Sequence, residues 1–404
     1  MNAANLIIFG LGVYFLIWLL IVWLGVGLLF LGVPGIYFIY MKRCSKGTWG
    51  LCMDSAYLPS VAIFVPVYNE QAVIGLKLEN LSKVVYPRDK VEIIIVNDSS
   101  SDNTLKIINQ YLTEHPIFKI TLFDSNKHLG KTGCLNQALK TVQSDIVIIS
   151  DADCFWPTDI LQKALFYLSD PNVGAITARE LLLNPGDTWV TLTEQFYDST
   201  IQLIRVGESK VHSTLFFQGG FAAYKRGMLK EFNSATDDSG TALDIIQNNK
   251  RTLLIPEIGF FTVSPTVWRD KFSMKIRRAN HLQQLWARCL WLMFQGKLVM
   301  PKRIAVPESF LHLFNPLLLV ILTLLTAGVM IVYPTMALII PGIFCLLLIV
   351  KKTRLTALEL IQNNLILLVA LSTFLTKRKF KFWKPVTETR SVLSAQVLRE
   401  KKLI

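Results

Sequence analysis

The 404-residue chain lacks the signatures of several common protein classes. Its six cysteines form no CxxC pair and no ligand-like cluster, which argues against a zinc ribbon or disulfide framework and predicts free thiols in a reducing compartment. A P-loop would need glycine five residues before Gly130-Lys131-Thr132, where Ser125 stands instead. No GxGxxG follows the first strand-like segment, so the dinucleotide-binding fingerprint is missing as well.

Charge is absent from two long segments, residues 6–40 and 309–350. Each exceeds the ~20 apolar residues that span a bilayer, and they account for the hydrophobic content of 52% and the mean hydropathy of +0.41. No basic residue precedes the first segment and no small-residue cleavage site ends it, so we expect a retained membrane helix rather than a signal peptide. Residues 58–305 have ordinary charged content and predict one sizeable folded domain.

Positive charge dominates outside those segments, with a net charge of +13. Lys42, Arg43 and Lys46 directly follow the first apolar segment, and the positive-inside rule therefore predicts a cytoplasmic central domain on an integral plasma-membrane protein. The tail from Lys377 is also basic. Beside apolar segments, anionic membrane lipids are favoured as its partner over nucleic acid, and no nucleic-acid partner is expected.

The C-terminal part contains further amphipathic and apolar segments. Residues 266–298 alternate bulky apolar side chains with lysine and arginine, which suits a membrane surface and, almost equally, a helix packed on the domain. Apolar segments on both sides of Tyr333-Pro334 predict a membrane hairpin. Basic residues flank 355–376 at both ends, so an interfacial position is favoured there over a span. The predicted parts are 1–45 (transmembrane helix and basic collar), 58–265 (cytoplasmic domain), 266–305 (interfacial helices), 306–376 (C-terminal membrane segments) and 377–404 (basic cytoplasmic tail).

The central domain alternates short apolar runs with helical segments. Strands are predicted where β-branched residues cluster and helices where capping residues such as Ser99–Asp102 precede a helical period. The strands fall at 61–65, 91–96, 119–123 and 145–150, with helices near 70–86, 102–111 and 131–142 between them. Short connections between alternating strands and helices are typical of an α/β fold, a doubly wound and mainly parallel sheet. A later strand is predicted at 252–255, ended by Pro256.

The most informative stretch is DIVIISDADCFWP at 145–157. Its apolar run predicts a strand buried on both faces, and such strands deliver the residues that follow them to the ligand cleft of a parallel sheet. Asp151 and Asp153 supply paired carboxylates there, which suit Mg²⁺ or Mn²⁺ holding a diphosphate. Taken alone, an Asp-rich turn is the simpler interpretation.

Two later stretches are ambiguous by themselves. A strand is predicted around 216–221, and Gln218, Gly219 and Gly220 interrupt it, which marks either a bulge or a close approach of a ligand or another backbone. Asp237 and Asp238 follow Thr236 and precede a helix predicted at 241–249, where acids most often act as N-terminal capping residues.

Together these motifs resemble family 2 glycosyltransferases, in particular the membrane-integrated group of cellulose, hyaluronan and poly-N-acetylglucosamine synthases. The likeness covers about 58–290. VPVYNE at 65–70 is similar to the opening nucleotide-pocket motif, NDSS at 97–100 stands where the family has DDGS, and Gly130-Lys131 with Leu135-Asn136 is similar to a further family stretch. Asp151-Ala152-Asp153 is similar to the family's DxD motif, and Thr236-Asp237-Asp238 occupies the place of its TED motif. Several motifs in family order outweigh the simpler interpretation of the DxD pair.

The resemblance implies a GT-A domain and a role for each matching residue. Asp238 would be the general base, and Asp151 and Asp153 would hold Mg²⁺ or Mn²⁺. The glycine loop, Gln218 with Gly219 and Gly220, would lie at the acceptor together with Asp237. The nucleotide-sugar would contact Pro66, Tyr68, Glu70, Asp98, Lys131 and Asp151, and Lys275, Arg277 and Arg278 would contact the diphosphate or acceptor.

One motif departs from the family pattern. The family's QxxRW falls at Met274–Arg278, where Arg277 is retained but methionine replaces glutamine and Arg278 replaces tryptophan. An arginine is not an equivalent stacking platform for an acceptor sugar. We therefore expect a membrane-bound inverting transferase that moves a sugar from a UDP-sugar to a lipid-linked or glycan acceptor. A processive β-glycan synthase and a catalytically silent nucleotide-sugar-binding subunit are the alternatives, and the sequence leaves the oligomeric state open.

Overall fold

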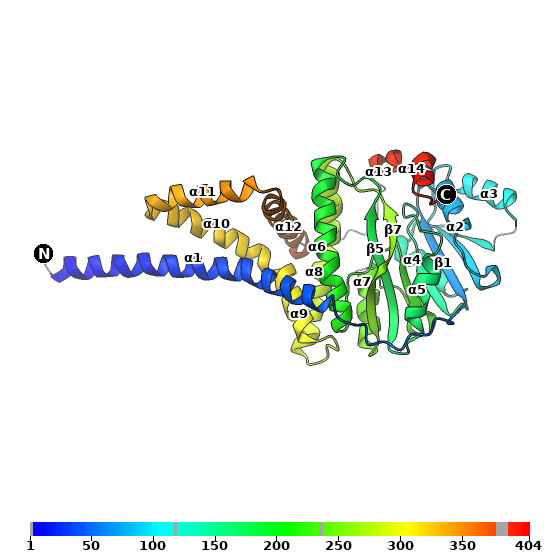
Figure 1. Cartoon of the computed structure of the whole chain (residues 1–404), viewed down its shortest axis with the longest axis horizontal. Coiled ribbons are helices and arrows are strands. Elements are labelled where there is room, and N and C mark those ends of the chain that lie inside the picture. Colours follow the sequence, from blue (N-terminus) through cyan, green and yellow to red (C-terminus); the bar gives the residue numbers. More distant parts are fainter. Residues whose placement is uncertain (1–2, 117–118, 234–236, 377–386) are drawn as a thin grey trace.

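The computed structural model describes residues 3–116, 119–233, 237–376 and 387–404. Figure 1 shows a sheet domain at one end and long helices that project from it to the other end. The basic stretch at 377–384 and residue Thr236 lie outside the described residues. The description below therefore concerns the sheet domain, the projecting helices and a C-terminal segment that returns to the domain.

The domain is built on one seven-stranded sheet with the strand order β3-β2-β1-β4-β6-β5-β7. β6 runs antiparallel to both of its neighbours, and the other neighbouring strands of the sheet are parallel to each other. The α/β class and the mainly parallel sheet predicted from the sequence are confirmed. The strands are β1 (Val61–Val67), β2 (Val91–Asn97), β3 (Ile120–Asp124), β4 (Ile146–Ile149), β5 (Val173–Leu182), β6 (Ala222–Lys225) and β7 (Arg251–Thr262).

Helices cover both faces of this sheet, so its central strands are buried on both sides. Along β1, Ile63 and Val65 pack into one hydrophobic cluster, while Ala62 and Phe64 pack into another on the opposite face. This is why the central strands are continuously apolar rather than alternating. The first cluster includes residues of α2 (Ile74–Ser82), α3 (Thr104–Glu114) and α5 (Ile160–Leu165), and the second includes residues of α4 (Lys131–Leu139) and α7 (Asp237–Gln247).

Two strand predictions in the later part of the domain were wrong. Residues 216–221 form a loop, and the antiparallel strand β6 begins only at Ala222. β7 does not end at Pro256 but continues to Thr262. The pairing of β7 with β5 shifts register there, because Ile255 pairs with Ala178 whereas Gly259 pairs with Arg179. The extra residues form a bulge, which accommodates the proline that cannot donate to the ladder.

The long helices join the domain through α6 (Trp189–Val211). α1 (Ala3–Cys44) packs on it near its own C-terminus, where Tyr37 Oη donates a 2.6 Å hydrogen bond to Glu208. Farther along α1, Trp23 Nε1 donates to Thr326 Oγ1 of α10 (Asn315–Val332) at 2.9 Å. The connection from α9 (Lys302–Ser309) to α10 is one π-helical turn, Phe310–Phe314.

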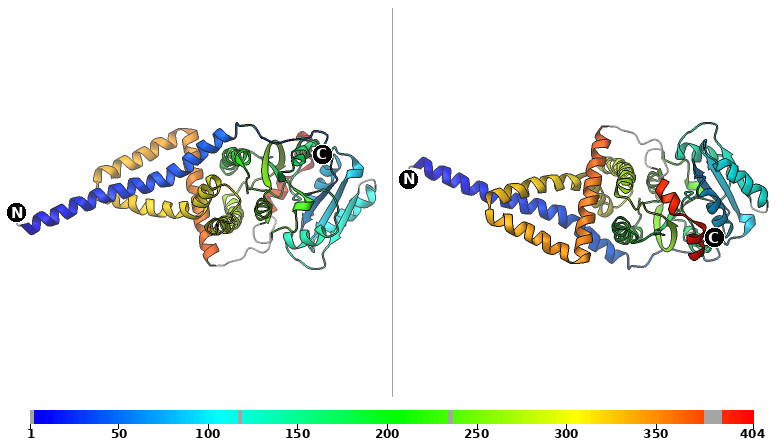
Figure 2. Two further views of the ribbon diagram at one scale, coloured as in Figure 1. Left: turned by 90° about the horizontal axis from the view of Figure 1, so that it is seen from below. Right: turned by 90° about the horizontal axis from the view of Figure 1, so that it is seen from above.

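Among the described residues, three helical stretches are long and apolar enough to cross a membrane: Tyr14–Cys44, Lys302–Val332 and Lys351–Phe374. They indicate association with a membrane. α11 (Pro334–Ile349) is a shorter apolar helix that returns beside α10. Figure 2 shows that α12 (Lys351–Leu375) runs across the ends of the projecting helices rather than alongside them.

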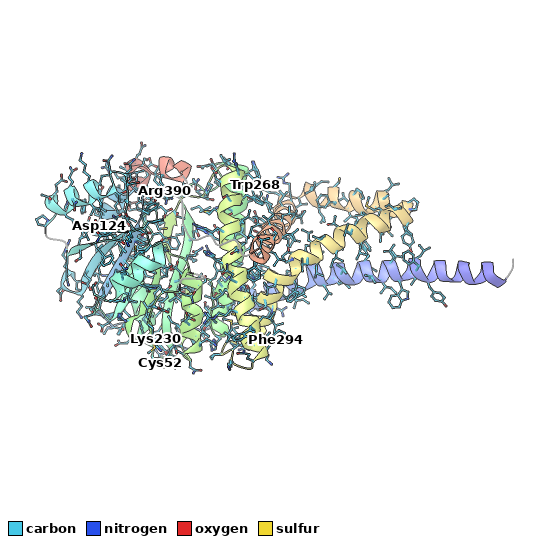
Figure 3. All side chains as sticks on the ribbon, turned by 180° about the vertical axis from the view of Figure 1, so that it is seen from behind. Cys52, Asp124, Lys230, Trp268, Phe294 and Arg390 are labelled. Atoms are coloured by element: carbon cyan, nitrogen blue, oxygen red, sulfur yellow. The ribbon has the colours of Figure 1, made fainter. Side chains whose placement is uncertain are left out.

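α8 (Trp268–Phe294) lies between the sheet domain and the projecting helices. Figure 3 labels its two ends, Trp268 and Phe294, at opposite margins of the molecule. Its apolar residues pack against α12 through a small cluster that contains Ala279, Ile366 and Ala370. α8 and α12 therefore form one layer between the domain and the helices that project from it.

The chain finally returns to the sheet domain as α13 (Thr387–Val392) and α14 (Ala395–Glu400). Leu393, Leu398 and Leu403 are buried in the first hydrophobic cluster. Asn80 Nδ2 of α2 donates to the carbonyl oxygen of Leu403 at 2.7 Å. This part of the predicted basic tail is therefore packed against the domain, with α13 beside the ends of the central strands.

Candidate active site

The predicted site residues converge at the carboxyl ends of the adjacent strands β1, β2 and β4. Glu70 follows β1, Asp98 follows β2, and Asp151 follows β4. Their convergence is the expected consequence of parallel strands that end at one edge of a sheet. Pro66 lies inside β1 and pairs with Val96, so it is part of the wall of this edge.

Asp98 forms the floor of the predicted nucleotide pocket. It is 4% exposed and accepts hydrogen bonds from the backbone N–H of Leu129 at 2.7 Å and the thiol of Cys134 at 3.0 Å. His128 Nδ1 lies 2.9 Å from its second oxygen. The His128 ring stacks on Tyr68, with centroids 4.2 Å apart. The sequence analysis predicted Tyr68 and Asp98 in this pocket but missed His128, which no motif marks.

Lys131 connects the two most important predicted carboxylates. Its Nζ donates to Asp151 at 2.8 Å and lies 3.4 Å from Asp238 Oδ2. Lys131 begins α4 and Asp238 lies in the first turn of α7, so residues from three separate elements meet here. Asp238 is buried, at 8% exposure. The side chain of Asp237 lies outside the described residues.

Asp151 and Asp153 offer oxygen donors that fit a hard divalent cation. One donor atom from each, with the thiol of Cys154, lie within 4.8 Å of one another. Burial raises the pKa of the Cys154 thiol well above its ordinary value, so the carboxylates are the available anionic ligands. Mg²⁺ and Mn²⁺ both accept such ligands, and the residues present therefore fit either ion.

The two glycines after Gln218 are required by close contacts. A Cβ atom on Gly219 would lie 2.5 Å from both Asp151 Oδ2 and Lys131 Nζ, and one on Gly220 would lie 2.2 Å from the ring of Phe260. The carbonyl oxygen of Gly219 also accepts a 2.8 Å hydrogen bond from the backbone of Asp151. Of the two interpretations of this loop, close approach is therefore the one that applies.

Arg390 of α13 is the principal site residue that the sequence analysis missed. Its guanidinium donates to both oxygens of Glu70, at 3.0 and 2.7 Å, and to Asp153 at 2.5 Å. Burial raises the pKa of Glu70 to about 7 in spite of this arginine. Figure 3 shows Arg390 at the sheet end of the molecule, on the segment that returns from α12. Since 237 positions separate Arg390 from Asp153, no local motif could have indicated the contact.

The three basic residues expected at the diphosphate separate into different environments. Lys275 is buried between α6 and α8, with its Nζ 2.7 Å from Glu194 and 4.0 Å from the centre of the Tyr197 ring. Lys275 therefore does not lie where the sequence predicted it, at the diphosphate. The reason is that it lies on the face of α8 that packs on α6. Arg278 is exposed. Desolvation lowers the pKa of its guanidinium, but nearby carboxylates, chiefly Glu180, outweigh this and raise the pKa. Arg277 is half-buried.

The fold and this arrangement of residues are those of the GT-A class of nucleotide-sugar-binding domains. The family model described as "Glycosyl transferase family 2" matches residues 62–232. The solved structure of a mannosyltransferase from Pyrobaculum calidifontis, in complex with GDP-Man and Mn²⁺, is 30% identical with a TM-score of 0.76. That match covers 89% of this chain and 100% of the other. The chain belongs to glycosyltransferase family 2.

Curated relatives match over shorter segments. A β-monoglucosyldiacylglycerol synthase from Synechocystis is 36% identical over 126 residues, which cover 31% of this chain and 26% of that protein. A poly-β-1,6-N-acetyl-D-glucosamine synthase from Staphylococcus epidermidis is 28% identical over 205 residues, 49% of this chain and 48% of that protein. The chain therefore spans about a quarter to a half of the length of these relatives.

Proposed function

We propose that the protein is a membrane-bound inverting glycosyltransferase that moves a sugar from a nucleoside diphospho-sugar to an acceptor at the membrane. The observation that carries this proposal is the position of Lys131, 2.8 Å from Asp151 and 3.4 Å from Asp238. It brings a cation for the diphosphate, a predicted metal ligand and a buried carboxylate into contact. These are the groups that a single displacement at an anomeric carbon requires.

In the proposed reaction, Asp238 accepts the proton of the acceptor hydroxyl as its oxygen forms a bond to the anomeric carbon. The bond from that carbon to the diphosphate oxygen breaks on the opposite face, and the nucleoside diphosphate leaves. Lys131 turns from Asp151 to the developing phosphate charge. When bound by Asp151 and Asp153, Mg²⁺ or Mn²⁺ would neutralise the remaining charge. A single displacement needs no second carboxylate as nucleophile and inverts the configuration.

The remaining pocket residues orient the donor. Asp98, anchored by the backbone of Leu129, is proposed to accept hydrogen bonds from the nucleotide base, against which Tyr68 and His128 provide an aromatic wall. We propose UDP-sugars as donors, as predicted from the sequence. GDP-mannose is the second candidate, because a structure with 30% identity and a TM-score of 0.76 contains GDP-Man.

The acceptor is proposed to be a lipid or a lipid-linked glycan on the cytoplasmic face of the plasma membrane. Exposed basic residues at the start of α12, Lys351, Lys352 and Arg354, support an interfacial position for this layer of the molecule. α8 lies in the same layer and carries exposed aromatic residues, Trp291 and Phe294, near its end. The names of the relatives, a glucosyldiacylglycerol synthase and a poly-N-acetylglucosamine synthase, are consistent with either kind of acceptor.

A processive glycan synthase is the second candidate, supported by the likeness to poly-N-acetylglucosamine synthases. Arg278 at the position of the family's tryptophan argues against it. The deciding experiment supplies purified protein in lipid nanodiscs with radiolabelled UDP-sugars or GDP-mannose, one at a time, with Mg²⁺ or Mn²⁺. One sugar added to a lipid-extractable product supports the proposal, whereas a long polymer supports the second candidate. Donor binding without turnover would identify a silent subunit instead.

A further inference from the structure

A lysine is buried directly behind the turn that carries the two proposed metal ligands, Asp151–Asp153, which we call the DxD turn. Lys77 lies on α2 and is 0% exposed. Its Nζ donates one hydrogen bond to Ser150 Oγ and another to the carbonyl oxygen of Cys154, both at 2.5 Å. Ser150 and Cys154 flank the DxD turn on its two sides, so a single ammonium group joins the ends of the turn.

The surroundings of Lys77 differ from those of the other two buried lysines among the described residues. Lys271 and Lys275 both pair with Glu194, at 3.0 and 2.7 Å. Within the described residues Lys77 forms no ion pair, and besides its two hydrogen-bond acceptors it meets the Trp156 ring, whose centre lies 5.0 Å from Nζ. Burial lowers the pKa of its ammonium group to about 8, although the acids of the DxD turn act to raise it. A buried charge without a paired acid costs free energy, so we expect a lysine at this position to have a specific role.

The DxD turn has a buried side and an open side. Ser150 and Cys154 are buried, whereas the side chains of Asp151 and Asp153 are 35% and 22% exposed. The backbone N–H of Cys154 donates to the carbonyl oxygen of Asp151 at 3.2 Å, which closes the turn. The turn therefore presents its carboxylates toward solvent and its flanking residues toward Lys77.

Two other cations bind the acids of the DxD turn directly. Lys131 Nζ lies 2.8 Å from Asp151, and Arg390 Nη1 lies 2.5 Å from Asp153. A divalent ion that takes both acids as ligands would compete with these two contacts. Lys77 binds a hydroxyl and a carbonyl oxygen instead, so its hydrogen bonds can persist while the ion is bound.

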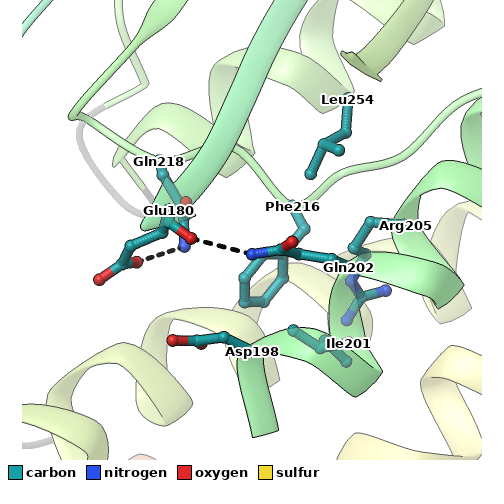
Figure 4. A pocket seen from close by; sticks show the side chains of 8 residues that line it. All are labelled: Glu180, Asp198, Ile201, Gln202, Arg205, Phe216, Gln218 and Leu254. Carbon is teal, nitrogen blue, oxygen red and sulfur yellow. Dashed lines mark hydrogen bonds between the residues drawn. The ribbon is translucent and has the colours of Figure 1, made fainter. Parts of the chain in front are cut away.

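The buried side of the DxD turn is also connected to the glycine loop. Ser150 Oγ, which accepts from Lys77, donates to the carbonyl oxygen of Gly220 at 3.3 Å. On the other side of the loop, Gln218 Nε2 donates to the carboxylate of Glu180 on β5 at 2.7 Å, as Figure 4 shows. Lys77 therefore ties the DxD turn to a loop that is held both from β4 and from β5.

We propose that Lys77 is a positioning residue of the metal site: its ammonium group fixes the ends of the DxD turn so that both carboxylates reach one divalent ion. Ligands that are already held in the bound geometry lose less conformational freedom when the ion binds, so the affinity for the ion depends on this support. The charge of Lys77 alone would repel the ion, so the benefit comes from its two hydrogen bonds. The inference rests on the proposed function, because it takes Asp151 and Asp153 as the metal ligands.

The test measures Mn²⁺ binding to the purified full-length protein in lipid nanodiscs, from the loss of the electron paramagnetic resonance signal of the free ion. Mn²⁺ is titrated alone and together with UDP or GDP, so the measurement does not require turnover. Lys77→Met has a side chain of similar length that donates no hydrogen bond, and we expect it to raise the Kd for Mn²⁺ about tenfold or more. Lys77→Gln keeps N–H donors without the charge and should give a Kd between those of the wild type and Lys77→Met.

Lys83→Met, the same substitution at an exposed lysine that follows α2, is the matched control and should leave the Kd unchanged. Thermal unfolding of each variant identifies a merely structural role, which would lower the melting temperature without changing the Kd. In a transfer assay, the Mn²⁺ concentration for half-maximal rate should rise in Lys77→Met by the same factor as the Kd. The kcat at saturating Mn²⁺ should stay within about twofold of the wild type.

Several results would overturn the inference. An unchanged or lowered Kd in Lys77→Met would mean that Lys77 supports only the fold or only repels the ion. A Kd in Lys77→Gln that is no lower than in Lys77→Met would exclude the hydrogen bonds as the cause. If Lys77→Met does not fold, Lys77→Gln decides: a Kd above that of the wild type supports the role of Lys77, and an equal or lower Kd overturns it.

The same measurements separate this inference from the proposed function. A Kd that responds to Lys77→Met in a protein that transfers no sugar would support the role of Lys77 and refute the proposed function. A wild-type protein that binds no Mn²⁺, alone or with either nucleotide, would overturn the metal site and this role of Lys77 with it.

Discussion

Two groups of interacting charged side chains in this molecule differ in how exposed they are to solvent. The first group lies in the candidate active site at the carboxyl ends of β1, β2 and β4, which we call the catalytic edge. There, the side chains of Lys131, Asp151 and Asp153 are 28%, 35% and 22% exposed. In the layer between the domain and the projecting helices, Lys271 and Arg205 are 1% and 3% exposed. We call this second set, which contains Lys271, Lys275, Glu194, Arg205, Glu208 and Glu308, the ionic joint.

The difference indicates what each set of charges does. In the ionic joint, Lys271 binds Glu194 at 3.0 Å, Val190 and Thr193, so exchange of partners would require unpacking of α6 and α8. At the catalytic edge, Lys131 shares two carboxylates and can exchange either one for a phosphate without moving a helix. Charges that are a quarter to a third exposed and come from different elements are suited to ligand exchange, whereas fully buried ones are suited to joining elements.

The largest effect is expected when the proposed general base is removed. For Asp238→Asn we expect kcat to fall by about 10²–10⁴, because the amide cannot accept the acceptor's proton. The melting temperature should change little, since Asp238 contributes to an exchangeable site rather than to the joint. Steady-state kinetics and thermal unfolding of the same preparation check both statements. A lowered melting temperature with an unchanged kcat would reverse the assignment.

The reciprocal change tests the ionic joint. Lys271→Met removes the cation between Glu194 and Glu359, and we expect a loss of about 3 kcal/mol in the free energy of unfolding, because Glu359 loses its cation and Glu194 keeps only Lys275. Denaturant titration in detergent measures it. The exposed Lys297→Met serves as the control. A variant as stable as the wild type, with catalysis abolished, would mean that the joint is part of the site.

Arg390 shares one property with each group. It is buried like the residues of the ionic joint, but it binds Glu70 and Asp153 at the catalytic edge. We expect Arg390→Ala to cost about 3 kcal/mol, since Glu70 is left buried without its cation. Arg390→Lys should lose less, because an ammonium group still pairs with Glu70 but cannot bind both oxygens as a fork. Thermal unfolding of the two variants gives the order. Equal stability of all three proteins would show that the C-terminal segment is not anchored by this residue.

The smallest expected effect is the dependence of stability on pH. Burial raises the pKa of Glu208 from an ordinary 4.5 to about 7 although Arg205 is adjacent. The folded state therefore binds this proton more tightly than the unfolded state, so the group's contribution is complete at low pH and is lost as pH rises through 7. Between pH 5 and pH 7 the loss amounts to about 2 kcal/mol. Because Glu70 has a similarly raised pKa, the wild type should show a larger slope than this, and Glu208→Gln should reduce the slope by about this amount. Unfolding curves measured at pH 5 and pH 7 check this, and equal slopes in the two proteins would contradict the prediction.

The first half of the sheet was predictable from local pattern, whereas the second half was not. β1, β2 and β4 are uniform apolar runs followed by polar residues, and the cleft at their ends follows from parallel pairing. β7 continues past Pro256 only because β5 pairs with it through a bulge, which no local signal indicates. β6 is a four-residue strand whose direction depends on its two neighbours.

The candidate site divides in the same way. Asp98, Lys131, Asp151 and Asp238 follow strands or begin helices within recognisable motifs, so the sequence indicated them. Arg390 carries no motif, because it reaches the site through the docking of α13. Lys275 shows the opposite error, since its motif position suggested the diphosphate but its helical face turns it into the ionic joint.

The most direct test of the account is a transfer assay with the purified protein in nanodiscs, using radiolabelled UDP-sugars and GDP-mannose, Mn²⁺ and octyl β-D-glucoside. We expect one donor to give a glycosylated product of inverted configuration, lost when Mn²⁺ is chelated and reduced by about 10²–10⁴ in Asp238→Asn. Turnover that persists unchanged in Asp238→Asn would contradict the central claim that the carboxylate beside Lys131 accepts the acceptor's proton.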